Sequence, residues 1–295
     1  LMHAGASGLA SVIIPMAKAF GIRVITSVLS DEIADSIKHL NADVIINTSK
    51  EKTANVLKRE LENGHGADVI IDCLGGEHMG ECLPYLTHGA RWIMIAALAG
   101  QKTEIDLKNI YVRNVRIIGS TLRSRTPEVK AQILAELVKN VFPKIEAGLV
   151  KPTIYKTFPI EQAEDAHAVL QRGDLMQREG DYPPPPGCPE WMGLEISGEI
   201  VEVGGEAKEK SDWKIGDKVC ALLGGGGYAE YVAVKYDMLM PVPKNCTMVE
   251  AAAIPEAFAT AYLNLFIEGK IKEGNTLLMH AGASGLASVI IPMAK

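Results

Sequence analysis

The stretch LMHAGASGLASVIIPMAK, residues 1–18, decides how this chain can fold. Its first residues read as the end of a buried strand, and apolar residues then recur at helical spacing from Leu9 to Phe20. Small residues at Ala4, Ser7 and Gly8 let a backbone approach a pyrophosphate, which the N–H groups of the first helical turn would bind. We therefore predict a dinucleotide phosphate cradle.

The same eighteen residues return, letter for letter, as residues 278–295. The two ends of the chain are thus two copies of one piece. A single fold of this kind has one cradle site, so only one of the two copies can fill it.

The composition bounds the class of protein. A length of 295 residues suggests about two domains, with 47% hydrophobic and 22% charged residues. The net charge of −6 without a basic cluster argues against nucleic acid, and the longest apolar runs are too short to span a bilayer. Five scattered cysteines without a CxxC pair favour a reducing compartment, and no secretory leader is visible. We expect a cytoplasmic protein with no membrane or nucleic-acid partner.

The first half alternates short apolar strands with helices of about ten residues, which predicts a parallel sheet covered on both faces. Ligands of such sheets bind at the carboxyl ends of the strands. We expect strands at 23–27, 43–47, 69–73, 91–96 and 115–121, and helices at 31–40, 51–62, 77–86 and 127–141.

The end of the second strand bears on cofactor choice. It carries the hydroxyls of Ser27 and Ser30, with no acid until Asp31. NAD-binding folds place an acid there to bind the ribose hydroxyls, whereas hydroxyls alone tolerate a 2′-phosphate. The pattern favours NADP, although Asp31 is near enough to serve NAD.

The character of the sequence changes after residue 173. Tyr182 precedes four prolines, which form either a linker or the wall of a pocket. Short strands with Gly and Pro turns follow, as in an all-β unit. We expect strands at 154–158, 193–203, 218–223, 228–234 and 240–242, and helices at 160–170 and 251–265.

The residues now resemble a known family. DLMQREGDYPPPPG (174–187), GLEISGEIVEVG (193–204), AAAIPEAFAT (251–260), HAGASG (280–285) and GSTLRSR (119–125) are similar to the zinc-free, zeta-crystallin-like quinone oxidoreductases of the medium-chain dehydrogenase/reductase superfamily. The resemblance implies a doubly wound α/β Rossmann domain and a GroES-like β-rich catalytic domain. In this sequence the Rossmann part would be residues 1–121, completed by 256–295, and an incomplete GroES-like part would be residues 122–255.

The order of these parts differs from the family, in which the β-rich part comes first. A circular permutation with partial deletion explains this order. A reading frame that runs around a closed or mis-assembled stretch of DNA explains it too, and better accounts for the terminal repeat.

The resemblance implies a role for individual residues. The pyrophosphate cradle would be Ala6, Ser7, Gly8 and Leu9, or Ser284, Gly285 and Leu286 in the second copy. Backbone groups of Ala97 and Leu98 would bind the nicotinamide, with Arg123 and Thr260 close to the cofactor. Tyr182 and Tyr228 would line the acceptor pocket and are the catalytic candidates.

The zinc-dependent relatives carry Gly-His-Glu where this chain has Gly193, Leu194 and Glu195. Leucine cannot bind a metal ion, so we expect no catalytic zinc. The resemblance then implies NADPH-dependent reduction of a quinone or enone by hydride transfer, with NADH possible, in a homodimer. The alternative is a nucleotide-binding protein whose catalysis is impaired, because Arg172 and Gly173 stand where the family often has an active-site Asn.

Overall fold

The computed structural model describes residues 8–154, 156–159, 162, 177, 180 and 183–279. Within the chain, two compact units are distinguished, Leu1–Thr121 with Ala261–Lys295, and Leu122–Thr260. Each unit is considered by itself. None of the helices in the described part of the chain combines the length and apolarity needed to cross a bilayer.

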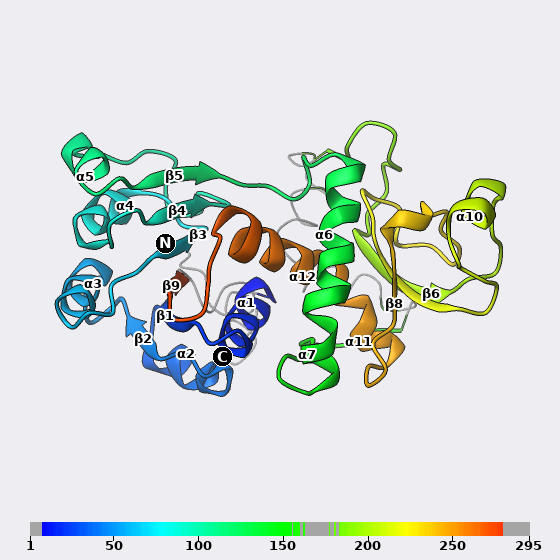
Figure 1. The fold of residues 1–295 in the computed structure, drawn as a ribbon, viewed down its shortest axis with the longest axis horizontal. Coiled ribbons are helices and arrows are strands. Elements are labelled where there is room, and N and C mark those ends of the chain that lie inside the picture. Colours follow the sequence, from blue (N-terminus) through cyan, green and yellow to red (C-terminus); the bar gives the residue numbers. More distant parts are fainter. Residues whose placement is uncertain are drawn as a thin grey trace. The chain divides into compact units, whose positions relative to one another are not determined.

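The first unit is built on a parallel sheet of six strands in the order β2-β1-β9-β3-β4-β5 (Figure 1). The predicted strands of the first half are all present, each within a few residues of its expected bounds. They are β1 (Arg23–Val28), β2 (Val44–Asn47), β3 (Val69–Asp72), β4 (Arg91–Met94) and β5 (Arg116–Gly119), with β9 (Thr276–Met279) from the far end of the chain.

Helices cover both faces of this sheet. Figure 1 shows α3, α4 and α5 on one side and α1 on the other. Ile25, Ile70, Trp92 and Leu278 belong to the core on the α3 side. The elements are α1 (Gly8–Ala19), α2 (Asp31–Ser36), α3 (Thr53–Glu62), α4 (Glu77–Cys82), α5 (Leu107–Tyr111), short 3₁₀ turns at Lys38–Leu40 and Leu83–Tyr85, and a π-helix at Leu263–Glu268.

The central strand and the helix beside it come from opposite ends of the chain. β9 includes Leu278 and Met279, which open the second copy of the repeat, and it pairs with β1 and β3. α1 belongs to the first copy, and it packs against β1 and β9. Pro15 lies inside α1 without ending it.

The second unit contains an antiparallel sheet in the order β6-β7-β8. Two of its predicted strands are wrong. Residues 228–234 form turns and irregular chain, and the described residues around 154–158 form no strand. The predicted helix at 160–170 lies almost wholly outside the described residues. The elements are α6 (Pro127–Asn140), α7 (Phe142–Glu146), β6 (Glu195–Glu199), α10 (Gly205–Lys210), β7 (Lys218–Leu222), a 3₁₀ turn at Tyr236–Met238, β8 (Leu239–Pro241), α11 (Met248–Ala252) and α12 (Pro255–Tyr262).

A close glycine crossing explains why the strand predicted at residues 228–234 does not form. Gly193 has a φ of +105°, and a Cβ there would lie 2.5 Å from backbone atoms of Gly227. The Gly227 N–H donates to the Gly193 carbonyl at 3.0 Å, and the Tyr228 N–H donates to the Met192 carbonyl at 3.1 Å. This tight crossing uses the backbone groups that a longer strand would need.

Candidate functional site

The first candidate site is the carboxyl edge of the six-stranded sheet, where parallel strands present their loops. The end of β9 is fixed there, because the buried Thr26 hydroxyl donates to the Met279 carbonyl at 2.9 Å. α1 begins at Gly8, and Leu9 is half-buried in its first turn. The cradle residues Ala6, Ser7, Ser284, Gly285 and Leu286 lie outside the described residues.

The serines at the end of β1 have different environments. Ser27 lies within the strand and is 2% exposed. Ser30 caps α2, because its Oγ accepts from the Ile33 N–H at 3.3 Å. Ser30 also donates to Glu32 at 3.1 Å. The hydroxyl that stands at the strand end is therefore that of Ser30.

The acid at this strand end has a cationic partner that the sequence did not reveal. Asp31 pairs with Lys50 and accepts from the Asn47 amide at 2.7 Å. The hydrogen bond from Lys50, and then that from Asn47, lowers the pKa of Asp31. Lys50 follows β2, and a lysine 19 residues from Asp31 carries no local sequence signal. Tertiary pairing of β1 with β2 brings the two groups together.

The loops after β3 and β4 are joined by backbone contacts. The Leu98 N–H donates to the Cys73 carbonyl at 3.0 Å, and the Ala99 N–H donates to the Leu74 carbonyl at 2.7 Å. Gly75 and Gly100 form a parallel bridge. Gly75 has a φ of +61°, and a Cβ there would lie 2.6 Å from the Gly100 carbonyl. Glycine is needed at position 75 for both reasons.

A fully buried carboxylate organises these loops. Asp72, at the end of β3, accepts from the N–H groups of Leu74 at 2.8 Å and Gly75 at 3.2 Å. It also accepts from the Trp92 indole at 3.0 Å, and His78 Nε2 lies 3.6 Å from it. Hydrogen bonds offset the cost of burying the carboxylate.

This edge suits a dinucleotide. The loops that follow β3 and β4 are short and contain Gly75, Gly76 and Gly100. Among the described residues, no hydrogen bond to the Ala97 N–H is found, whereas that of Leu98 is used by Cys73. Ala97 is exposed and Leu98 is half-buried. The backbone of Ala97 is thus the better placed of the two to bind a carboxamide.

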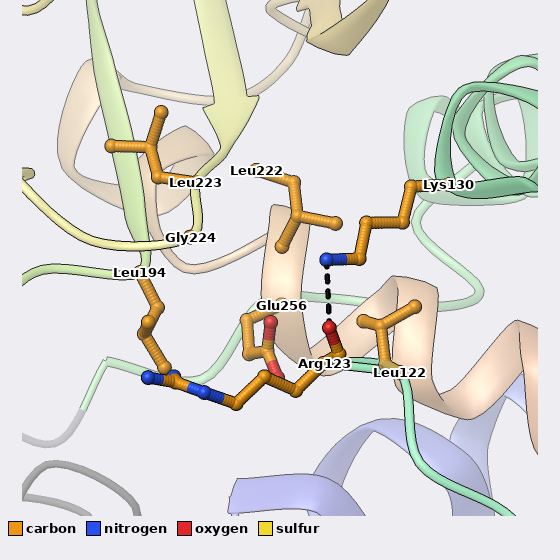
Figure 2. A pocket seen from close by; sticks show the side chains of 8 residues that line it. All are labelled: Leu122, Arg123, Lys130, Leu194, Leu222, Leu223, Gly224 and Glu256. Carbon is orange, nitrogen blue, oxygen red and sulfur yellow. Dashed lines mark hydrogen bonds between the residues drawn. The ribbon is translucent and has the colours of Figure 1, made fainter. Parts of the chain in front are cut away.

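The second unit contains a pocket of about 260 Å³, counting its open mouth (Figure 2). Its walls combine leucines with three charged side chains. Arg123 and Lys130 come from the start of the α6 region and Glu256 from α12, and the remaining lining residues are Leu122, Leu194, Leu222, Leu223 and Gly224.

Hydrogen bonds fix the charged groups of the pocket. The Lys130 Nζ donates to the Arg123 carbonyl at 3.0 Å. The Arg123 guanidinium donates to the Pro183 carbonyl, from NH2 at 2.9 Å and from Nε at 3.3 Å. This bond ties the predicted pocket-wall prolines to the pocket. Lys130 and Glu256 were not singled out from the sequence, because a lysine on an amphipathic helix reads as a solvated residue.

The remaining predicted residues are distributed as follows. Tyr228 is 50% exposed in the glycine-rich loop, and Thr260 is half-buried in α12. Both lie in the second unit, but neither lines the pocket. Tyr182 lies outside the described residues.

Leu194 and Glu195, which the resemblance aligns with the zinc-binding motif of other relatives, both have other contacts in the structure. Leu194 lines the pocket, and the Glu195 carboxylate accepts from the Glu256 N–H at 2.9 Å, in the first turn of α12. Within the described ranges, no three His, Cys, Asp or Glu side chains come together as a metal site would require.

The fold defines a class, an α/β protein with a parallel six-stranded sheet and a second, β-containing unit. Residues 8–139 match the family profile described as zinc-binding dehydrogenase, and residues 166–244 match the alcohol dehydrogenase GroES-like domain. Both matched regions therefore resemble domains of the medium-chain dehydrogenase/reductase superfamily.

Individual relatives match over part of their length. The chain is 38% identical over 119 residues to a quinone oxidoreductase-like protein 2 homolog of Nematostella vectensis, covering 39% of this chain and 32% of that protein. It is 33% identical over 117 residues to the human synaptic vesicle membrane protein VAT-1 homolog-like, covering 40% and 27%. The chain spans between 4% and 32% of the length of the curated relatives it matches.

A solved structure is also similar over part of its length. A mycobacterial quinone oxidoreductase gives a TM-score of 0.48 at 26% identity, over 60% of this chain and 52% of that chain.

Proposed function

We propose that the chain is an NADPH-dependent reductase of quinones or enones that works without a metal ion. The observation that carries the proposal is Leu194. It stands where zinc-dependent relatives carry a histidine, and it forms part of the pocket wall. Its neighbour Glu195 is used to cap α12. An apolar wall at this point favours a planar acceptor, such as a quinone or enone, which is already electrophilic. It does not favour an alcohol, whose oxidation needs a Lewis acid.

The cofactor would lie along the carboxyl edge of the six-stranded sheet. NADPH supplies a hydride when it is bound. Asp72 holds the β3 turn in place, and through the Gly75–Gly100 bridge that turn supports the loop that carries Ala97. Orientation by a rigid edge is what hydride transfer needs from the protein.

The test is oxidation of NADPH by a naphthoquinone and by an enone, each with and without a strong chelator. The proposal predicts turnover with both acceptors and no loss of rate with the chelator. Folded protein that binds NADPH without turnover on any acceptor would refute the reductase. Loss of activity with the chelator, restored by zinc, would refute its independence of metal.

The preference for NADPH over NADH rests on the strand end beside Ser30. Lys50 could meet a 2′-phosphate, but Asp31 now neutralises it. We therefore expect Asp31→Asn to lower the KM for NADPH by about threefold to tenfold and to leave that for NADH nearly unchanged. Adding Lys50→Met to Asp31→Asn should raise the KM for NADPH again. An equal effect on both cofactors would show that Asp31 does not face the 2′ position.

A second candidate function is nucleotide binding without catalysis. It is favoured by the second unit, where residues 228–234 form no strand and the described sheet has three strands. It predicts enhanced NADPH fluorescence on binding and no acceptor reduction. The acceptor assay above separates it from the first.

We also propose that the chain order is a permutation of the family order. β9 occupies the place of the first strand in the Rossmann order, and α1, from the other end of the chain, stands beside it. The match to the dehydrogenase family precedes the match to the GroES-like domain. Long-read sequencing of the flanking DNA distinguishes the two explanations of this order, since an intact parent gene in the usual order would favour the reading frame around closed or mis-assembled DNA and refute a genuine circular permutation.

A homodimer is the proposed assembly. β5 is the edge strand of the sheet, and Ile117 on it is 42% exposed. Nearby α5 exposes Leu107, Tyr111 and Val112. Edge strands with apolar neighbours are commonly covered by pairing. Sedimentation would test it, with Ile117→Lys expected to give monomers. The cytoplasmic location inferred from the cysteines stays a prediction.

A further inference from the structure

The pocket of the second unit contains a cation for which the proposed reaction has a use. Lys130 projects from α6, and its Nζ lies among Leu222, Leu122 and the Glu256 side chain (Figure 2). One of its three N–H donors is spent on the Arg123 carbonyl at 3.0 Å. No other hydrogen bond of this ammonium group is found within the described part of the chain. Two donors can therefore reach a molecule in the pocket.

We infer that Lys130 is the proton donor of the proposed reduction, binding the acceptor's carbonyl oxygen and protonating the anion that hydride addition leaves. This inference rests on the proposed function. The family often has an active-site Asn where this chain has Arg172 and Gly173. In the proposed mechanism, Lys130 of α6 polarises the acceptor in its place.

The step balances. For an enone, the hydride carries two electrons to the β-carbon, and the displaced π pair moves to leave an enolate on the carbonyl oxygen. One N–H bond of Lys130 breaks, and its proton passes to that enolate. Lys130 is left neutral and regains a proton from water. A quinone follows the same course to the hydroquinone.

The surroundings of Lys130 ease the loss of its proton. Burial lowers the pKa of Lys130, and the positive charge of Arg123 acts in the same direction. Glu256 and Cys188 oppose this effect and favour the charged form. The net effect is a lowered pKa, so the Lys130 ammonium is a better acid than a lysine in water.

A binding experiment without cofactor tests the inference directly. The probe is 4-nitrophenol, whose phenolate resembles the enolate and has its own absorption band. With the wild-type chain, the pKa of bound nitrophenol should fall by about 1 to 3 pH units, because a cation faces the oxygen. Lys130→Met should abolish this shift. Lys139→Met, on the exposed side of the same helix, should keep it.

Two further variants separate charge from proton donation. Lys130→Arg keeps the positive charge but not a removable proton, so the nitrophenolate shift should persist while kcat falls about 100-fold or more. Lys130→Gln can still donate to the Arg123 carbonyl, so it serves if Lys130→Met does not fold. The shift should be absent in Lys130→Gln.

The outcomes separate the two proposals. Failure of the wild type to bind nitrophenol, or an equal shift in Lys130→Gln, overturns the role of Lys130 whatever the turnover. A nitrophenolate shift that depends on Lys130, with no acceptor reduction by the wild type, supports the cation in the pocket and refutes the reductase. Full kcat in Lys130→Arg would overturn proton donation.

Discussion

The repeat allows an unusually well-controlled prediction, because the same substitution can be made twice in one chain. Ile13 lies in α1 with 0% exposure, and Leu278 lies in β9 with 0% exposure. Their counterparts in the other copy are Ile290 and Leu1. We expect the cost of truncation to fall on the first copy for the helix and on the second copy for the strand.

The magnitude follows from burial. Ile13→Ala removes three buried carbons, worth about 0.8 kcal/mol each, or about 2.4 kcal/mol in transfer free energy. A residual cavity raises the expected loss of unfolding free energy to about 3–5 kcal/mol. Leu278→Ala removes three buried carbons from the central strand and should cost about the same. Ile290→Ala and Leu1→Ala should each cost less than about 1 kcal/mol.

The assay is urea unfolding followed by circular dichroism, with the four variants measured beside the wild type. The loss of unfolding free energy should be large for the strand residue of the second copy and for the helix residue of the first copy, and small for their two counterparts. Equal losses for Ile13→Ala and Ile290→Ala would refute the placement of the first copy in the sheet's helix layer. Equal losses for Leu278→Ala and Leu1→Ala would refute the placement of β9.

Three further predictions concern two aspartates and three thiols. Asp43→Ala should cost about 1–3 kcal/mol, because Asp43 accepts from Lys18 at 2.7 Å and from the Val24 N–H at 2.7 Å. Burial raises the pKa of Asp43, but these bonds outweigh burial and lower the pKa. The contribution of Asp43 to the free energy of unfolding should therefore be complete above about pH 4 and be lost as the pH falls further. An acid transition that is the same in the wild type and in Asp43→Ala would contradict this prediction. Asp72→Asn should cost about 1–3 kcal/mol and shift the tryptophan emission, since it weakens the bond to Trp92, and Trp92→Phe should abolish that emission shift. Burial raises the pKa of the Cys73, Cys82 and Cys220 thiols to about 12. The free energy of unfolding should therefore fall as the pH rises from about 9 towards 12, and a thiol reagent should reach these thiols only in urea. Fast labelling of any of the three in the folded chain would refute their burial.

Much of the architecture followed from pattern alone. Strands such as 69–72 begin with a continuous apolar run, and periodicity with glycine turns was enough to predict a parallel sheet covered on both faces. The cap at Ser30 was predictable too, because it depends on residues three apart. The strand expected at 228–234 was wrong, since an apolar alternation cannot show that Gly193 and Gly227 will cross too closely for a ladder to extend.

The sequence by itself predicted a phosphate cradle and showed that its eighteen residues occur twice. Only the tertiary structure decided that the strand beside it comes from the second copy and the helix from the first, because the two copies are chemically identical and only packing distinguishes them. The same holds for Lys50 beside Asp31 and for Lys130 in the pocket. Local patterns determine helices and strands, whereas a charge acquires its partner from residues far away in the chain.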